Sequence, residues 1–471
     1  MKWHLNQIAK WTDAQIISEH QKEFLQLGTD TRKDLTGQVF IALKGVAYDA
    51  HHYLDQAVQK GASALIVHEL PEKFQHLKSQ ISILKVKDTL KALQDFAHHY
   101  RNTLNTKIIG ITGSNGKTTT KEFTAQILGQ YKKTHFSEGS FNNHWGVPMT
   151  LLSIPQDADF AVIEMGMNHA GEITQLVKIA NPDIVVCTMV GTAHLEFFGT
   201  QENIAKAKSE IYMESKSETI RIFNQDQDLT FDMMYPVSRK FPASRMLSFS
   251  EKNTEADVFF KITELKMKEM KITGIIAGEE GSAVVPVFGK QNLTNLMAAA
   301  TIAYACRLSP EQIWKALPYC KTAWGRNQFI ETNNQAEILF DGYNANPDSM
   351  KALLENIPLL VCTGKKIGVF GQMKELGEQS ANAHVEIAAM AGTADFSQIY
   401  FIGEDFKAFQ KGLASSGFKG EMLIQAEFDA PLGEKLGKTV KAGDIIVIKG
   451  SRGAGTERFI PFCDPLNWKS K

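Results

Sequence analysis

One segment near residue 110 constrains the fold of this chain more than any other. The β-branched run KIIGIT (107–112) leads through a glycine-rich loop into the helical stretch TTTKEFTAQILGQY (118–131). Glycines let backbone N–H groups approach a phosphate, and the helix that follows presents its positive end to it. The order of strand, loop and helix therefore predicts an α/β domain with a doubly wound parallel sheet and a nucleotide site at this loop.

The loop departs from the strict P-loop template G-x-x-x-x-G-K-[ST], because Ile111 stands where the first glycine is required. We expect Lys117 to neutralise the terminal phosphates of ATP and Thr118 to offer its hydroxyl to magnesium. The other loop residues expected to bind ATP are Gly113, Ser114, Asn115, Gly116 and Thr119. The alternative is a glycine-rich turn that caps a helix and binds nothing. The pattern also leaves open whether a nucleotide would serve phosphoryl transfer, ligation or conformational switching.

The 471 residues of the chain predict about three domains, since roughly 150 residues is usual for one domain. Residues 1–105 contain the short strand-like runs VFIAL (39–43) and ALIV (64–67), with a helical pattern between them. The helical stretch DTLKALQDFAHHYRN (88–102) follows as a connection. These patterns predict a small α/β domain at the N-terminus.

Residues 106–322 are expected to form the central P-loop domain, with further strands at FAVIEM (160–165) and DIVVCTMV (183–190). Residues 323–471 return to the same alternation and predict a third, Rossmann-like α/β domain. Its strand-like runs are AEILFD (336–341), KIGVFG (366–371), QIYFIG (398–403) and DIIVIKG (444–450). Ligands bind such sheets at the carboxyl ends of the parallel strands, where polar residues and glycines follow each run.

Composition excludes several functional classes. The 51 basic residues nearly cancel the 52 acidic ones, so the net charge predicts no attraction to nucleic acid or to an anionic membrane. Five dispersed cysteines without a CxxC pair argue against a disulfide framework or a zinc knuckle. The N-terminus lacks the apolar stretch of a signal peptide, and no apolar run approaches roughly 18 residues. We expect a soluble cytoplasmic protein.

Three further residues follow the central strands and are candidates for a metal site. They are Glu164 after FAVI, His194 in GTAHLEFFG and Lys208 in AKAKSEI. A carboxylate and an imidazole are ordinary companions of the magnesium that binds a triphosphate. Each residue also has a structural interpretation, as a solvated strand-end carboxylate, a packed or surface histidine, or a lysine on an exposed helix face.

Several longer strings resemble the Mur ligase family. They are TGSNGKTTTKEF, EMGMNHAGEI, TAHLEFFGT and DGYNANPDSM, and the unusual glycine spacing of the loop is that family's form. The strings SFNNHWGVP (140–148), YNANP (343–347) and GQMKELGEQS (371–380) resemble the branch that adds D-alanyl-D-alanine. The resemblance extends from Asp30 to about Arg458, and it therefore covers nearly the whole chain.

The resemblance implies an ATP-dependent ligase that forms an amide bond through an acyl phosphate. Its substrates would be UDP-N-acetylmuramoyl tripeptide and D-alanyl-D-alanine, and its product the pentapeptide precursor of peptidoglycan, made in the last cytoplasmic step. ATP and two magnesium ions would be required, and we expect a monomer. One alternative is a ligase of the same family with another amine substrate. The other is a nucleotide-dependent binding or switch protein.

The resemblance also assigns residues to roles. Lys117 and Thr118 would hold phosphates and magnesium, and Glu164 and His194 would complete the metal sites. Lys208 matches a lysine that the family carbamylates, which turns a cation into a carboxylate-like metal ligand. Catalysis would therefore rest on Lys117, Glu164, His194 and Lys208.

The string GKQNLTNLMAAA resembles the family's adenine-contacting helix and places Asn292 and Asn295 near the base. Gln291 stands where this branch commonly has histidine, so a hydrogen-bonding side chain is kept but a titratable ring is lost. Further ATP contacts are expected from Arg326, Asp341 and Asn344. The YNANP string is equally explained as a helix start, with Asn346 as N-cap and Pro347 at the first helical position. The loop KGSRGAG (449–455) is either ligand-facing or a plain glycine turn.

The N-terminal domain would bind the UDP-linked substrate. The string DTR (30–32) resembles the family's usual DSR, so Thr31 keeps the hydroxyl and Arg32 the charge. Gln38 and Ala50 replace an aspartate and a glycine that are usual nearby. Asn142 and Asn143 in SFNNHWGVP are the other residues expected to bind substrate.

Overall fold

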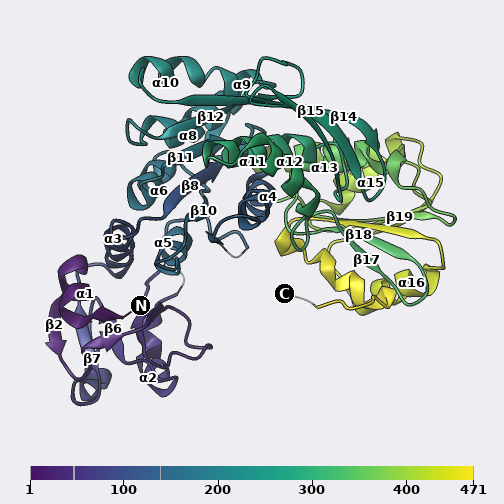
Figure 1. The fold of residues 1–471 in the computed structure, drawn as a ribbon. Coiled ribbons are helices and arrows are strands. Elements are labelled where there is room, and N and C mark those ends of the chain that lie inside the picture. The colour runs from purple at the N-terminus through teal and green to yellow at the C-terminus, as the bar shows by residue number, and fades with distance from the viewer. Residues whose placement is uncertain (1, 46–47, 138, 470–471) are drawn as a thin grey trace. The chain divides into compact units, whose positions relative to one another are not determined.

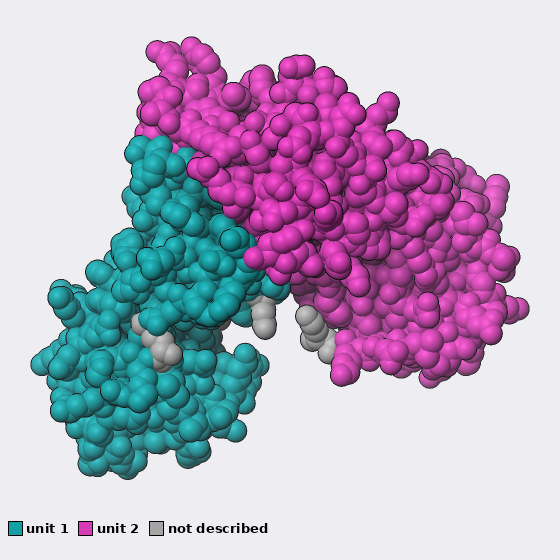
Figure 2. Space-filling model, viewed as in Figure 1, with its two compact units in different colours: residues 1–110, 132–185, 210–219 teal, residues 111–131, 186–209, 220–471 magenta. Residues whose placement is uncertain are grey.

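The computed structural model describes residues 2–45, 48–137 and 139–469. The chain separates into two compact units (Figure 2). Unit 1 consists of residues 1–110, 132–185 and 210–219, and unit 2 of residues 111–131, 186–209 and 220–471. The α/β fold class predicted from the sequence is confirmed in both units (Figure 1). Within the described part of the chain, no helix is long and apolar enough to cross a membrane.

The N-terminal part of unit 1 is a five-stranded sheet in the order β2-β7-β6-β5-β4. Strand β2 is antiparallel to its neighbour, whereas the other strands are parallel. The predicted strands at 39–43 and 64–67 are confirmed as β5 and β6. The bounds are β2 Gln15–Ser18, β4 Gln26–Gly28, β5 Gln38–Ile41, β6 Ala64–Val67 and β7 Ser82–Lys85. Helix α2 (Leu54–Gln59) packs on this sheet through Leu54 and Ala57, which are fully buried.

Helix α3 (Thr89–Arg101) confirms the predicted connecting helix. The side chain of Asp88 caps its start by accepting a hydrogen bond from Lys91 N at 3.0 Å. On one side the helix contacts α1 (Leu5–Thr12), and the ring of Trp3 lies 4.8 Å from that of Phe96. On the other side it contacts α5 (Gly146–Leu152) and α6 (Glu172–Ala180) (Figure 1). The helix therefore joins the N-terminal sheet to the rest of unit 1.

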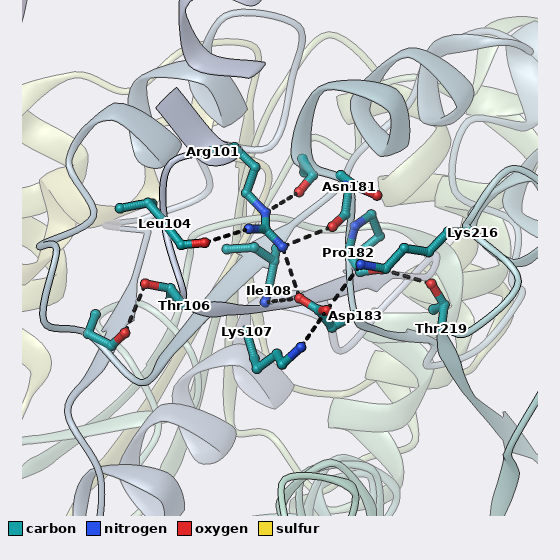
Figure 3. A network of polar contacts seen from close by, with 12 residues as sticks. Arg101, Leu104, Thr106, Lys107, Ile108, Asn181, Pro182, Asp183, Lys216 and Thr219 are labelled. Atoms are coloured by element: carbon teal, nitrogen blue, oxygen red, sulfur yellow. Dashed lines mark hydrogen bonds and ion pairs between the residues drawn. The ribbon is translucent and has the colours of Figure 1, made fainter. Parts of the chain in front are cut away.

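A buried group of charges fixes the end of α3. Figure 3 shows Arg101, Lys107 and Lys216 around the carboxylate of Asp183, and these four residues form what we call the Asp183 cluster. Arg101 Nη2 donates to Asp183 Oδ2 at 2.9 Å, and its Nε donates to the last carbonyl of α6 at 2.9 Å. Lys216 and Lys107 lie 3.1 and 3.2 Å from Asp183 Oδ1. Burial alone would raise the pKa of Asp183, but a hydrogen bond from Ile108 N and the charges of Lys216 and Arg101 hold it below its ordinary value.

The chain passes from unit 1 to unit 2 within β8 (Lys107–Thr112), and again within β11 (Ile184–Cys187). In unit 1, β10 (Phe160–Glu164) pairs in parallel with β9 (Thr134–Phe136). In unit 2, the parallel strands β12 (Ile220–Asn224), β13 (Met246–Ser250) and β14 (Val258–Leu265) continue into an antiparallel pair, β15 (Met270–Ile276) and β16 (Glu279–Val285). The sequence predicted only the parallel strands at 107–112, 160–165 and 183–190, which are confirmed.

Helix α4 (Lys117–Gly129) confirms the helix predicted after the glycine-rich loop. It packs against α11 (Asn292–Ala305), whose side chains are buried nearly all round. A helix without a polar face must be covered on every side, and α11 also contacts β12, β13 and β14. The two helices place the loop before α4 beside the start of α11.

The C-terminal part of unit 2 is a six-stranded sheet in the order β17-β18-β22-β19-β20-β21. All neighbours are parallel except β17, which is an antiparallel edge strand. The four predicted strands are confirmed. The bounds are β17 Gln328–Glu331, β18 Glu337–Asp341, β19 Lys366–Gly371, β20 Gln398–Ile402, β21 Glu421–Gln425 and β22 Ile445–Lys449. Helices α13 (Pro347–Glu355), α14 (Ser380–Gly392) and α15 (Phe406–Ser415) contribute to one apolar cluster, and α16 (Ala430–Thr439) to another.

The turn between β14 and β15 reaches the C-terminal sheet. Met267 packs against the apolar cluster that α13, α14 and α15 build. Lys268 forms an ion pair with Glu337 at the start of β18, and its ammonium lies 5.4 Å from the ring centre of Phe329. The C-terminal sheet is thus attached to the preceding strands both by the chain itself and by this hairpin tip.

Candidate nucleotide-binding site

Glycine is required at two positions of the loop between β8 and α4. Gly113 and Gly116 have φ angles of 147° and 82°, which side chains rarely tolerate. A Cβ at Gly113 would lie 1.9 Å from Thr188 Oγ1, and one at Gly116 would lie 2.3 Å from Asn295 Oδ1. The loop is therefore held against two other segments at distances that only glycine permits.

The segment that follows β11 holds this loop in place. Thr188 Oγ1 donates to Asn115 O at 2.6 Å, and Ser114 N donates to Met189 O at 2.8 Å. Lys117 is the first residue of α4, and its Nζ donates to Gly113 O at 2.7 Å. The ammonium group therefore lies over the loop, where a phosphate bound to the backbone N–H groups would meet it.

A cavity of about 190 Å³ opens beside the loop. Its wall combines the loop and α4 with the start of α11, the segment after α12 (Pro310–Ala316), the ends of β18 and β22, and α13. The residues around it include Asn115, Gly116, Thr119, Asn292, Asn295, Arg326, Asp341, Asp348 and Lys449. Most residues predicted to contact ATP thus surround one cavity, together with others that were not predicted, among them Asp348 and Lys449.

Asn295 connects α4 to α11. Its Oδ1 accepts a hydrogen bond from Thr120 Oγ1 at 3.2 Å, and its Nδ2 donates to Asn292 Oδ1 at 3.2 Å. Asn292 Nδ2 in turn donates to Phe288 O at 2.7 Å. Gln291 accepts a hydrogen bond from Asn356 Nδ2 at 3.0 Å, so the residue that replaces the usual histidine bonds with the chain after α13.

Lys449 forms a buried ion pair with Asp341 at the ends of β22 and β18. Its Nζ lies 2.5 Å from Asp341 Oδ2 and also donates to Asn344 O at 3.2 Å. Burial lowers the pKa of Lys449, although Asp341 opposes the shift. The side chain of Asn344 is exposed, so this residue enters the group only through its carbonyl. The guanidinium of Arg326 lies 4.6 Å over the ring of Tyr343 and 3.4 Å from Thr118 Oγ1.

Lys208 on α8 (Gln201–Met213) is 1% exposed, which excludes the interpretation as a lysine on a solvated helix face. Burial first, and then the neighbouring cation Lys117, lower the pKa of Lys208 to about 7. A substantial fraction of this side chain is therefore a neutral amine near pH 7. Neutral amines are nucleophiles, whereas ammonium groups are not.

His194 lies next to a carboxylate that the sequence analysis did not single out. Its Nδ1 is 3.0 Å from Glu375 Oε2, and both residues have left-handed backbones, with φ angles of 68° and 64°. The hydrogen bond with His194 lowers the pKa of Glu375, although burial opposes the shift. Two strained residues on different segments are thus held facing each other.

Glu164 ends β10 in unit 1 and is 1% exposed, so it is not a solvated strand end. Asn142 Nδ2 donates to Glu164 Oε1 at 2.8 Å, and Gly166 N donates to Asn142 O at 2.7 Å. These contacts bring together two residues that the sequence predicted separately. Asn143 instead accepts a hydrogen bond from Gly146 N at 2.9 Å, at the start of α5.

The DTR string lies beyond β4 in the N-terminal sheet. Thr31 Oγ1 donates to Gln56 Oε1 at 3.0 Å, and Arg32 makes two hydrogen bonds with Asp30, at 2.8 and 2.9 Å. Arg32 lowers the pKa of Asp30 to about 2, while burial opposes the shift. The side chain of Arg32 is 86% exposed, and its charge therefore faces solvent at the surface of this sheet.

Comparison with known proteins decides the family. Residues 111–303 match the Mur ligase middle domain, and residues 325–452 match the Mur ligase, glutamate ligase domain. A Bacillus subtilis protein, UDP-N-acetylmuramoyl-tripeptide--D-alanyl-D-alanine ligase, is 33% identical over 446 residues, which is 92% of either chain. The chain belongs to the Mur ligase family.

Solved structures agree with this membership. A crystal structure of MurF from Acinetobacter baumannii superposes with a TM-score of 0.86 at 30% identity and covers 98% of both chains. A crystal structure of MurF ligase from Thermotoga maritima in complex with ADP has a TM-score of 0.77 at 26% identity, covering 93% of this chain and 97% of that one. The likeness to Mur ligases thus extends over nearly all the chain.

Three residues of this Mur ligase site escaped the sequence analysis as individual residues. Lys449 stood in a quoted string as the last residue of a strand, and Glu375 stood in another. Asp348 accepts hydrogen bonds from Thr192 N and Oγ1 at 2.7 and 2.9 Å, which ties α13 to the segment before His194. It stood in the string DGYNANPDSM and lies in the first turn of a helix, where a carboxylate is common.

Few of the described side chains are grouped in a way that could bind the predicted magnesium ions. Among the residues that the structure describes, no group of three or more histidine, cysteine, aspartate or glutamate side chains is arranged to hold a metal ion by itself. Magnesium commonly takes one or two protein ligands and completes its shell with water and phosphate oxygens. Buried Glu164 and the hydroxyl of Thr118 are oxygen donors of the required kind.

Proposed function

We propose that this Mur ligase joins D-alanyl-D-alanine to UDP-N-acetylmuramoyl tripeptide and converts ATP to ADP and phosphate. The product would be the UDP-linked pentapeptide, formed in the last cytoplasmic step of peptidoglycan precursor synthesis. The observation that carries this proposal is the 33% identity, over 92% of both chains, to a relative with that name. We further propose a cytoplasmic monomer with domains at 1–105, 106–322 and 323–471.

ATP is the nucleotide that the cavity beside the loop would bind. The ADP complex of the Thermotoga relative supports this, and so does the glycine geometry of the loop. Lys117 and the loop would contact the phosphates, and Asn292 and Asn295 the base. Arg326, Asp341 and Asn344 would contact ribose, base or phosphate from the C-terminal side.

The chemistry requires activation, because a free carboxylate has no adequate leaving group. The terminal carboxylate of the tripeptide would attack the γ-phosphorus of ATP, which breaks the bond to the β-phosphate oxygen and releases ADP. The ammonium of Lys117 would stabilise the charge that develops on the transferred phosphoryl group. The amine of D-alanyl-D-alanine would then attack the acyl phosphate, and loss of phosphate and a proton would leave the amide.

Lys208 is suited to carbamylation. Its pKa of about 7 leaves the amine free to attack the carbon of carbon dioxide, which forms the N–C bond and releases a proton to solvent. The resulting carbamate carries a negative charge near Lys117. Bound magnesium would supply charge stabilisation at the phosphates. Thr118, Glu164, His194 and the carbamate of Lys208 are the groups that we propose to hold it.

The UDP-linked substrate would bind unit 1. The exposed guanidinium of Arg32 suits a diphosphate, and Thr31 adds a hydroxyl beside it. Asn142 donates a hydrogen bond to Glu164, which we propose as a magnesium ligand, and Asn143 accepts a hydrogen bond at the start of α5 in the same segment. These four residues are our candidates for substrate binding.

The test is an omission assay. ADP and phosphate formation would be measured with ATP, magnesium, UDP-muramoyl tripeptide and D-alanyl-D-alanine, each left out in turn, and the product identified by mass. Turnover that needs all four and gives the pentapeptide is the expected result. If turnover occurs only with another amine in place of D-alanyl-D-alanine, the proposed amine substrate is wrong but the mechanism stands. If no amine supports turnover, a nucleotide-dependent binding or switch protein becomes the better hypothesis.

A further inference from the structure

His384 is a buried histidine that the proposed mechanism does not use. It lies in the second turn of α14 and is 1% exposed. Its Nδ1 lies 2.7 Å from Ser380 O, and its Nε2 lies 3.0 Å from Met373 N. A backbone N–H can only donate, so Nε2 is the acceptor and Nδ1 carries the proton. Burial lowers the pKa of His384, which agrees with a neutral ring.

Met373 belongs to segment 372–377, which connects β19 to the helical turn η5 (Gly377–Gln379). Met373 is 1% exposed, and its N–H is buried with His384 as its acceptor. A buried N–H that loses its acceptor is costly, so the ring determines where this part of the segment can lie.

A second set of contacts fixes the first residue of the segment. Gln372 Nε2 donates to Asp405 Oδ2 at 2.6 Å, and Asp405 N donates to Gln372 Oε1 at 3.1 Å. Ser380 Oγ donates to the same carboxylate oxygen at 2.5 Å. His384 Nδ1 lies 3.3 Å from Asp405 as well, so the start of α14 and the segment share one carboxylate.

The segment presents two charged side chains. The Nζ of Lys374 lies against Gly453, where an added Cβ would approach it to 2.6 Å. Lys374 also lines a cavity of about 270 Å³ between the ends of β20 and β21 and the turn η6 (Arg452–Ala454). Glu375 faces His194. Its φ of 64° is a conformation that costs energy and persists only where neighbouring contacts enforce it. The contact with His194 therefore depends on how firmly the preceding residues are held.

From this geometry we propose that His384 is a positioning residue of the ligase. Through Met373 N–H it holds segment 372–377 so that Glu375 meets His194 and Lys374 reaches its cavity. His384 touches no substrate and acts only through the segment. Its effect on turnover rests on the proposed function, whereas its effect on the segment does not.

The first test measures the segment directly. Hydrogen exchange of a peptide that spans residues 372–377 would be compared between the wild type and His384→Phe, which keeps a ring in the core but removes the acceptor. Exchange should rise by about tenfold or more, because local opening loses its main constraint. His384→Gln places an oxygen where Nε2 lies and should keep most of the protection. Unchanged exchange in His384→Phe would overturn the proposal.

A matched control separates positioning from general loss of packing. The ring of Phe401, on β20, lies 5.7 Å from that of His384 and is 1% exposed, but it makes no hydrogen bond to the segment. Phe401→Leu should lower the melting temperature while leaving exchange in 372–377 and turnover close to those of the wild type. If Phe401→Leu raises hydrogen exchange in 372–377 as strongly as His384→Phe does, loss of core packing explains the increase and the proposal fails.

A double-mutant cycle tests the link to Glu375. His384→Phe and Glu375→Gln should each lower kcat by about 10- to 100-fold, with the KM for ATP nearly unchanged. The double variant should be no worse than either single variant, because both act through one contact. Losses that multiply would overturn the proposal. If the wild type forms no pentapeptide, the proposed function fails, and the exchange experiment still decides the role of His384.

Discussion

The two buried groups of charge in this protein are built in opposite ways. The Asp183 cluster in unit 1 places a carboxylate among three cations and adds a hydrogen bond from Ile108 N. In unit 2, Lys208 is buried near another cation, Lys117, and its pKa falls to about 7. Opposite charges stabilise the carboxylate of Asp183, whereas burial first, and then the like charge of Lys117, destabilise the protonated form of Lys208.

This contrast separates a structural role from a functional one. A satisfied ion cluster supports the fold, since removing one partner leaves a buried charge uncompensated. A buried lysine that is difficult to protonate lowers stability wherever the unfolded chain would be protonated, but it gains reactivity. Changes in the two groups should therefore affect different measurements.

The largest effect is expected from Asp183→Asn. The amide can still accept the hydrogen bond from Ile108 N, but Arg101 and Lys216 lose their counter-charge. We expect the free energy of unfolding to fall by about 3–5 kcal/mol, measured by urea titration. Asp157→Asn, which breaks an exposed pair with Lys133, is the control and should change nothing measurable. If Asp183→Asn loses no more stability than Asp157→Asn, the Asp183 cluster does not support the fold as proposed.

Lys208→Met should lower activity without lowering stability. Methionine fills a similar volume without burying a charge, so the melting temperature should stay level or rise. Ligation should fall by about 10²- to 10³-fold, since the group proposed to help hold the metal is gone. Scanning fluorimetry and the phosphate-release assay measure the two effects. A variant that melts early and is inactive would assign Lys208 to the fold instead.

The pH dependence of stability should carry the signature of Lys208. In the unfolded chain this lysine returns to its ordinary pKa of 10.5, compared with about 7 in the folded protein. Between these values the unfolded state holds the extra proton, so stability rises with pH, by up to about 1.4 kcal/mol per unit. Urea titrations at pH 7, 8 and 9 should show this rise in the wild type relative to Lys208→Met. If the free energy of unfolding changes with pH equally in the wild type and in Lys208→Met, the low pKa of Lys208 is contradicted.

The smallest effect is expected at the edge of the Asp183 cluster. Lys107 lies 3.2 Å from Asp183, but its side chain is 61% exposed. Solvent screens such a charge, so Lys107→Met should change the free energy of unfolding by less than about 0.5 kcal/mol. Arg101→Met, in the buried position, serves as the comparison in the same titration. If both variants lose the same free energy of unfolding, burial does not determine how much each cation contributes to stability.

Much of the fold was predictable because its parallel strands are short β-branched runs that end at glycine or polar residues. The runs at 107–112, 366–371 and 444–450 all became strands with nearly the same bounds. The antiparallel strands β15 and β16 were not predicted. Apolar residues of β15 alternate with lysine and threonine in MKIT, and β16 begins with the four non-apolar residues EEGS, so neither strand is a continuous apolar run.

The phosphate loop was predictable because its geometry is local. The cap of α13 was too, since Asn346 accepts a hydrogen bond from Ser349 N and Pro347 follows it. The same amide also bonds with Asn115, 231 residues away, and no local pattern encodes such a contact. The pairing of Glu375 with His194 is of the same kind. The roles assigned to the site residues stay predictions.

The hairpin tip at Met267 and Lys268 limits how the C-terminal sheet can turn. A body joined to another by one flexible link can rotate about any axis through that link. A second attachment leaves a single axis, the line through both points. Further contacts, such as the hydrogen bonds of Asn346 with Asn115 and of Asp348 with Thr192, also hold this sheet. If those contacts break while Met267 stays packed and Lys268 stays paired with Glu337, any rotation of the sheet is hinge-like, and the cavity beside the glycine-rich loop widens or narrows along one path.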